Sequence, residues 1–162
     1  MASLVDTNVL VYRFDPRDPL KQSIADDTLR PGITAGALVL PHQAILEFVS
    51  AVIRPRPDLG GEPLLPQRDA LLEAESLMRQ FRVVYPGEEV LLTALRGVTT
   101  YGLSWFDAHL WAYAECYGFD EIISEDFEHG RHYGRVRAVD PFLVAAGHVQ
   151  DLPPLYQAPN SG

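Results

Sequence analysis

The sequence predicts an α/β domain, a three-layer α/β/α sandwich around a central, mostly parallel sheet of about four or five strands. Short apolar runs bounded by glycine, proline or acidic residues recur along the chain, as buried strands do. They alternate with longer segments in which apolar residues return every three or four positions, the period of an amphipathic helix. Strands alternating with helices favour a parallel sheet covered by helices. The 162 residues fit one domain with a sizeable core.

The first elements follow from apolar runs and from proline. Residues 3–5 predict a first strand, and residues 9–12 continue it as a strand turning into a short helix. Pro19 suits the first turn of a helix, because its missing N–H would have no partner there. We expect this helix to reach about residue 29 and to end before Pro31 and Gly32.

The middle of the chain predicts two strands and two helices. Residues 37–40 form a second buried strand, closed by a proline. A helix follows over residues 45–52, where apolar residues share one face. Residues 54–66 are rich in proline and glycine and form a loop. Residues 67–81 predict another helix, and residues 82–85 a third strand.

The last third repeats the alternation. Residues 88–100 predict a helix with acids in its first turn, where the helix dipole favours them. A second helix spans residues 105–117, between a serine that can cap it and a glycine that stops it. Residues 122–123 and 136–139 predict a fourth and a fifth strand.

Composition indicates an intracellular protein with a short tail. We expect residues 1–145 to form the folded domain and residues 146–162 a proline-rich tail, poorly ordered at its end. The single cysteine, Cys116, excludes an internal disulfide and a cysteine-rich zinc site. No apolar run is long enough to span a membrane, and the N-terminus has no signal-peptide pattern. We therefore expect a cytoplasmic protein with no membrane partner.

The net charge of −9 limits the class of partner. Phosphate binding usually needs a basic face, so the charge alone argues against nucleic acid. That objection weakens if several carboxylates hold divalent ions, because each ion brings two positive charges to the place where a phosphate would lie. A basic partner protein is equally compatible with the charge.

Four acids stand where a metal site could form. Asp6 and Asp126 each follow an apolar strand, and ligands of open α/β sheets bind outside the carboxyl ends of strands. Glu47 lies in the helix at 45–52, and Asp107 begins the apolar face of the helix at 105–117. Such carboxylates need a partner, and ligand sets made only of oxygen suit Mg²⁺ or Mn²⁺.

Each acid also has a purely structural interpretation. Asp6 could cap a helix starting near residue 8, and Ser104 with Asp107 fits a capping box. Asp126 could open a surface turn, and Glu47 could be a half-exposed helix residue. Residue spacing alone leaves both interpretations open.

Four short segments resemble the motifs of PIN-domain nucleases, in the same order and at similar spacing. Asp6-Thr7-Asn8-Val9-Leu10 resembles the opening motif, Leu46-Glu47-Phe48 the second acid, residues 103–108 the third and residues 124–130 the segment carrying the fourth. The resemblance runs from about residue 4 to residue 142. The branch most closely resembled is the VapC-type toxin ribonucleases of prokaryotic toxin–antitoxin pairs.

This resemblance implies a function, partners and a ligand set. It implies a metal-dependent ribonuclease that uses Mg²⁺ or Mn²⁺ to hydrolyse RNA phosphodiester bonds, forms homodimers and is neutralised by a small antitoxin. The implied catalytic and metal-binding residues are Asp6, Glu47, Asp107 and Asp126, with hydrogen bonds to the carboxylates or bound water from Thr7, Asn8 and Ser124. Glu125 is the second choice for the fourth acid.

Two other classes compete with this one. Haloacid-dehalogenase-like phosphatases also begin with an aspartate at a strand end, but they need a second aspartate two residues later as general acid. Asn8 occupies that position and cannot donate a proton in this way. A PIN-like fold that binds RNA or protein without cutting is the main alternative. Loss of an acid would signal such a module, and all four acids are present.

Overall fold

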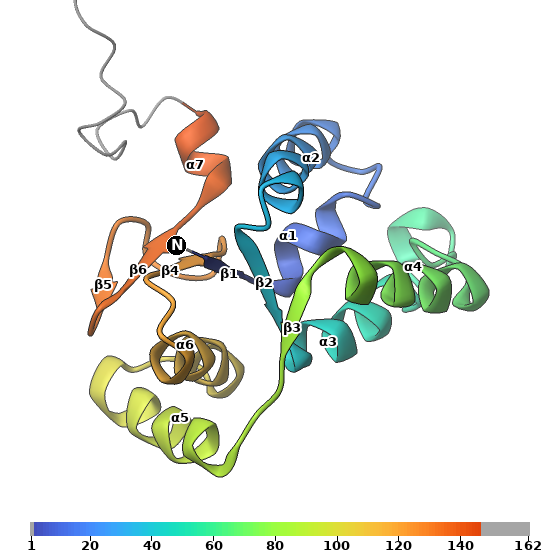
Figure 1. Ribbon diagram of the computed structural model, residues 1–162. Helices are drawn as coiled ribbons and strands as arrows, with labels where there is room; N and C mark the ends of the chain where they lie inside the picture. The colour runs from blue at the N-terminus through green and yellow to red at the C-terminus, as the bar shows by residue number, and fades with distance from the viewer. Residues whose placement is uncertain (1, 147–162) are drawn as a thin grey trace, which may run out of the picture.

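The computed structural model describes residues 2–146 of the chain (Figure 1). Within this range one sheet has the strand order β3-β2-β1-β4-β6-β5. β5 pairs antiparallel with β6, whereas the other neighbouring strands are parallel. The strands are β1 (Ser3–Val5), β2 (Leu38–Pro41), β3 (Arg82–Val84), β4 (Glu121–Ile123), β5 (His132–Tyr133) and β6 (Val136–Val139). The predicted α/β class with a mostly parallel sheet is confirmed.

Helices on the two faces of the sheet give the three layers. One face carries α5 (Glu88–Tyr101) and α6 (Trp105–Tyr117), which lie side by side in Figure 1. The other face carries α1 (Thr7–Tyr12), α2 (Pro19–Thr34), α3 (His42–Val52), α4 (Gln67–Gln80) and α7 (Pro141–Ala145). A 3-10 helix, Pro57–Leu59, lies in the loop between α3 and α4.

The strands have a buried residue on each face, which explains their continuous apolar runs. Leu4 and Ile122 lie opposite each other in the sheet and pack into the core beneath α5 and α6. Their neighbours Val5 and Ile123 pack into the core on the other face. Successive side chains of a strand point to opposite faces, so two adjacent apolar residues are enough to join both layers.

Two expectations about the first half of the chain were wrong in part. Residues 9–12 do belong to a short helix, as expected, but α1 begins at Thr7, so the strand does not continue into them. α2 continues through Pro31 to Thr34, well beyond residue 29. Because Asp27 and Pro31 are both exposed, water can replace the hydrogen bond that proline cannot make. Gly32 lets this last part of α2 pack closely against β2, because a Cβ at this position would lie 2.5 Å from the Leu38 side chain.

The C-terminal part contains two elements that the sequence pattern did not predict. The two-residue strand β5 adds a sixth strand, joined to β6 by a turn at Gly134, whose φ is 66°. Two residues are too few to show an alternating pattern. α7 begins after Asp140, which accepts hydrogen bonds from the backbone N–H groups of Phe142 and Leu143. The predicted tail lies, apart from Ala146, outside the described residues.

The sheet brings two of the predicted acids to the same edge. β1 and β4 are adjacent and parallel, with Val5 opposite Ile123. Asp6 is the next residue after β1, and Asp126 lies in the irregular segment after β4. Both acids therefore stand at strand carboxyl ends, as their position after apolar runs predicted. None of the helices within residues 2–146 is long and apolar enough to cross a membrane.

Candidate functional site

Asp6 lies at the centre of the site and is held by three donors. It is the N-cap of α1 and accepts a hydrogen bond from the Thr7 backbone N–H at 2.6 Å. Its other carboxylate oxygen accepts from Ser124 Oγ at 2.6 Å and from Asn8 Nδ2 at 3.2 Å. Asp6 is buried, with 7% of its surface exposed. The capping role suggested by the sequence is real, but it uses only one of the two oxygens.

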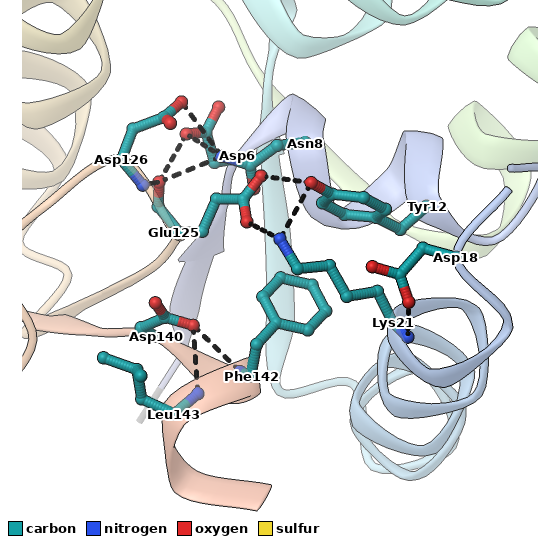
Figure 2. A network of polar contacts seen from close by, with 11 residues as sticks. Asp6, Asn8, Tyr12, Asp18, Lys21, Glu125, Asp126, Asp140, Phe142 and Leu143 are labelled. Carbon is teal, nitrogen blue, oxygen red and sulfur yellow. Dashed lines mark hydrogen bonds and ion pairs between the residues drawn. The ribbon is translucent and has the colours of Figure 1, made fainter. Parts of the chain in front are cut away.

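Asn8 holds the Asp126 carboxylate beside that of Asp6. Its Nδ2 also lies 3.0 Å from Asp126 Oδ2 and 3.3 Å from Ser124 Oγ. Ser124 in turn accepts a hydrogen bond from the Asp126 backbone N–H at 3.0 Å. Figure 2 shows Asp6 and Asp126 facing each other with the Asn8 side chain alongside. An amide group is suited to this place because it bridges two carboxylates without neutralising them.

Glu47 reaches the same region from α3. Its Oε2 accepts a hydrogen bond from Thr7 Oγ1 at 2.9 Å, and its Oε1 accepts from Gln43 Nε2 at 2.7 Å. Thr7 thus connects the Glu47 carboxylate to the turn of chain that carries Asp6. Gln43 was not identified from the sequence, although it lies one helical turn before Glu47 and therefore on the same face.

Asp107 lies in the first turn of α6 and also lines the cleft. Ser104 is the N-cap of α6 and accepts a hydrogen bond from the Asp107 backbone N–H at 3.3 Å. The Ser104 hydroxyl donates to Asp107 Oδ2 at 2.5 Å. The capping contact is therefore made by the Asp107 backbone, and Asp107 lines the same cleft as the other three acids.

These acids line a cleft of about 660 Å³. Burial, together with the charges of Asp126 and Glu47, raises the pKa of Asp6 to about 7, although hydrogen bonds from Ser124 and Thr7 act in the opposite direction. Partial burial and the same two charges raise the pKa of Asp107. The acids repel one another across the cleft, as like charges in a shared site do.

The same cleft also contains basic side chains. Arg17, Arg54 and Arg56 line it, the latter two from the start of the proline-rich loop after α3. Arg17 is paired with Asp15 and Asp58 at 2.6 Å each. Arg54 is exposed and makes no ion pair within the described residues. Sequence reasoning did not single out Arg54 and Arg56, because their loop gives no periodic signal.

Glu125 occupies a different position from its neighbour Asp126. It lines the cleft, yet its carboxylate is bound to the Lys21 ammonium at 2.5 Å and to the Tyr12 hydroxyl at 2.6 Å. Figure 2 shows these three side chains grouped on the α2 side of Asp6. Asp126 is bound by Asn8, which also binds Asp6, whereas Glu125 is paired with Lys21.

A protein-family model of the PIN domain matches residues 3–134. The chain belongs to the PIN-domain family. The resemblance noted in the sequence is thereby confirmed. Among curated proteins, no match is found.

Solved structures share the same PIN fold at low sequence identity. The chain is similar to a toxin–antitoxin complex from Klebsiella pneumoniae, with 17% identity, a TM-score of 0.58 and coverage of 86% of this chain and 98% of that one. VapC20 of Mycobacterium tuberculosis, a toxin that cleaves the sarcin–ricin loop, shows 14% identity and a TM-score of 0.55, with coverage of 90% and 95%. FitAcB of Neisseria gonorrhoeae shows 18% identity and a TM-score of 0.58, with coverage of 86% and 97%.

The PIN-domain acids fit a hard divalent cation by their chemistry. All four candidate ligands are carboxylates, and the Asn8 Oδ1 atom is buried with no hydrogen-bond partner within residues 2–146. Across those residues, no three acidic, histidine or cysteine side chains converge closely enough to enclose an ion. Side-chain donors from Thr7, Asn8 and Ser124 occupy the oxygens that an ion would use, so binding would require these contacts to rearrange.

Proposed function

We propose that this PIN domain is a metal-dependent ribonuclease that hydrolyses RNA phosphodiester bonds. The observation that carries the proposal is the gathering of four carboxylates, from four separate segments of the chain, in one cleft. Buried carboxylates are unfavourable unless they are paired or bind a metal. The buried Asp6 accepts hydrogen bonds from neutral groups and, within residues 2–146, has no cationic side chain as partner.

In this proposal Asp6, Glu47, Asp107 and Asp126 hold Mg²⁺ or Mn²⁺, directly or through water. The bound ion would activate a water for attack on phosphorus and stabilise the leaving oxygen. The protein's own contribution is to orient the carboxylates. Thr7, Asn8 and Ser124 keep the carboxylates near one another before an ion binds, and these contacts would rearrange as the ion takes over carboxylate oxygens.

The charge distribution supports RNA as the substrate despite the net charge of −9. Arg54 and Arg56 line the same cleft as the acids, so a neighbouring phosphate of a bound strand would have basic partners there. A bound divalent ion would add positive charge beside the acids.

A toxin role belongs to the same proposal. The solved relatives include a toxin–antitoxin complex and a toxin that cleaves the sarcin–ricin loop. We expect a cytoplasmic homodimer, neutralised by an antitoxin with an apolar and partly basic segment. Exposed apolar residues on α5, namely Leu91, Leu92 and Leu95, offer a surface for such contacts. Copurification with the product of a neighbouring reading frame and the mass measured by light scattering would test these points.

An RNA cleavage assay tests the proposed activity. Wild type should shorten RNA with Mg²⁺ or Mn²⁺ and should stop when a chelator is added. Asp126→Asn should lose at least about 100-fold in rate, because even partners of metal ligands cost about 10–100-fold. Glu75→Gln, which changes an exposed acid on α4, should cleave like wild type. Wild type that holds RNA in chelator and never shortens it with either ion would instead be a silent binding module.

A further inference from the structure

A closed ring of three hydrogen bonds lies beside the four acids and has no part in the chemistry proposed above. The Tyr12 hydroxyl donates to Glu125 Oε1 at 2.6 Å, and Lys21 Nζ donates to Glu125 Oε2 at 2.5 Å. Lys21 Nζ also donates to the Tyr12 oxygen at 3.0 Å. We call Tyr12, Lys21 and Glu125 the Glu125 clamp; Figure 2 shows it between Asp6 and α2.

The Glu125 clamp is partly enclosed, and aromatic rings support its cation. Only 30% of the Lys21 side chain and 22% of the Glu125 side chain are exposed. Lys21 Nζ lies 4.6 Å from the centre of the Tyr12 ring and 5.0 Å from that of Phe142. Desolvation lowers the pKa of Lys21, but its hydrogen bonds to Glu125 and Tyr12 outweigh this and raise it. The ammonium therefore stays charged, and the pair is better shielded from water than a surface ion pair.

The segment that the clamp holds is irregular. Residues 124–128 follow β4 and belong to no helix or strand. Ser124 and Phe127 are buried at either side of the two acids, whereas Asp126 is exposed. The orientation of the Asp126 carboxylate thus depends on side-chain contacts rather than on a strand ladder.

One helix contacts both acids of this segment. Asn8 and Tyr12 lie one turn apart on α1 and therefore on one face. Asn8 binds Asp126, and Tyr12 binds Glu125. Lys21 adds a third point of attachment from α2. Two consecutive residues of an irregular segment are thereby tied to two consecutive turns of a helix.

We propose that the Glu125 clamp is a positioning device that fixes the segment after β4 against α1 and α2 and so keeps the Asp126 carboxylate beside that of Asp6, where the proposed ion would bind. This inference rests on the proposed function, because it assigns the clamp a role in assembling the same site. Tyr12, Lys21 and Glu125 act through Asp126 and do not themselves bind the ion.

If Lys21 and Glu125 affected ion binding only through their charges, a different result would be expected. Lys21 is a cation near a site for cations, so removing its charge should strengthen ion binding through space, whereas removing the charge of Glu125 should weaken it. If the clamp positions Asp126, both changes should weaken ion binding. The sign of the Lys21 effect therefore separates positioning from charge.

The experiment measures Mn²⁺ binding to the full chain by titration calorimetry. Lys21→Met keeps an unbranched apolar side chain but removes the ammonium, and Glu125→Gln removes the charge of its partner. We expect each to raise the Kd for Mn²⁺ by about 10-fold, the lower end of the range for groups that orient metal ligands. Lys21→Arg should restore most of the affinity. Arg30→Met, which removes a cation that pairs with Asp26 elsewhere on α2, should leave the Kd within about twofold, as expected for an exposed ion pair.

Hydrogen exchange in chelator gives a second readout that needs no metal. Amides of residues 124–127 should exchange faster in Lys21→Met than in wild type, while those of α6 should be unchanged. Unchanged or tighter Mn²⁺ binding in Lys21→Met would overturn the proposal, and so would unchanged exchange in this segment. Wild type that binds no Mn²⁺ and cleaves no RNA would instead refute the proposed function, and the exchange result would then stand as a statement about the loop alone.

Discussion

Two buried aspartates line the same cleft and have opposite electrostatic environments. Asp15, 5% exposed, is bound by the Arg17 guanidinium through two nitrogens, at 2.8 and 2.6 Å, and its pKa is lowered. Asp6, 7% exposed, accepts hydrogen bonds only from neutral groups in the part of the chain that the structure describes, and burial with nearby carboxylates raises its pKa to about 7. Their exposed fractions are similar, but desolvation by the surrounding protein is the largest influence on the pKa of Asp6, whereas the hydrogen bond from Arg17 is the largest influence on that of Asp15. The cationic partner therefore decides the direction of the shift at Asp15, and burial without such a partner decides it at Asp6.

The same contrast separates two neighbours in sequence. Glu125 is paired with Lys21, whereas Asp126 is held by the neutral amide of Asn8. The cleft therefore contains acids whose charge is balanced within the protein and acids whose charge is not. The second group, around Asp6, is the one that an external cation would stabilise.

The sharpest test of this difference is to neutralise each buried aspartate and measure Mn²⁺ binding. Asp6→Asn should weaken binding by at least about 100-fold, more than the loss of an orienting group would. Asp15→Asn should leave the Kd within about threefold, because Asp15 is engaged by Arg17 and holds no ion. Equal losses in the two variants would show that the acids around Asp6 are not a distinct metal site.

The pH dependence of the metal-free protein should reflect the same contrast. The Asp6 pKa rises from 3.8 to about 7 on folding, so this residue stabilises the fold least above about pH 7 and most below about pH 4. The shift corresponds to at most roughly 4 kcal/mol. The lowered pKa of Asp15 has the opposite sign, because its contribution is present above its ordinary pKa and lost as the pH falls.

Thermal melting in chelator measures how the stability of the metal-free protein depends on pH. Wild type should melt at a lower temperature at pH 8 than at pH 5.5, and Asp6→Asn should melt at nearly the same temperature at both. Added Mg²⁺ should raise the melting temperature more at pH 8 than at pH 5.5, because the ion needs the ionised carboxylate. An identical pH profile in Asp6→Asn would mean that another group controls the slope.

Asp107 extends the comparison to a residue whose backbone N–H takes part in the cap of α6 and whose carboxylate is a proposed metal ligand. Ser104→Ala removes the cap of α6 and should cost about 0.5–2 kcal/mol of stability, with RNA cleavage retained below the melting temperature. Asp107→Asn keeps the backbone N–H that Ser104 accepts, so stability in chelator should be nearly unchanged while cleavage is lost. Guanidinium unfolding and the cleavage assay, applied to both variants, distinguish cap from ligand. Normal cleavage by Asp107→Asn would remove it from the proposed ligand set.

Much of the fold was determined by local pattern. Adjacent apolar residues such as Leu4 and Val5, or Ile122 and Ile123, indicate strands buried on both faces, and the structure places them in two separate cores. The helix predicted over residues 105–117 has the same bounds in α6. The spacing of apolar residues within a short stretch of sequence indicates both the type of element and its buried side, so these elements could be predicted without tertiary information.

The partners of the acids could be decided only by tertiary structure. Position after a strand placed Asp6 and Asp126 at one edge and favoured Asp126 over Glu125, but it could not show that the two acids have different partners. That distinction depends on Lys21, which lies on a different element 104 residues away in sequence from Glu125. The same holds for Arg54 and Arg56, which reach the cleft from an irregular loop. A sequence pattern records which residues are buried, whereas the charge that a buried acid meets is set by which distant segments fold against it.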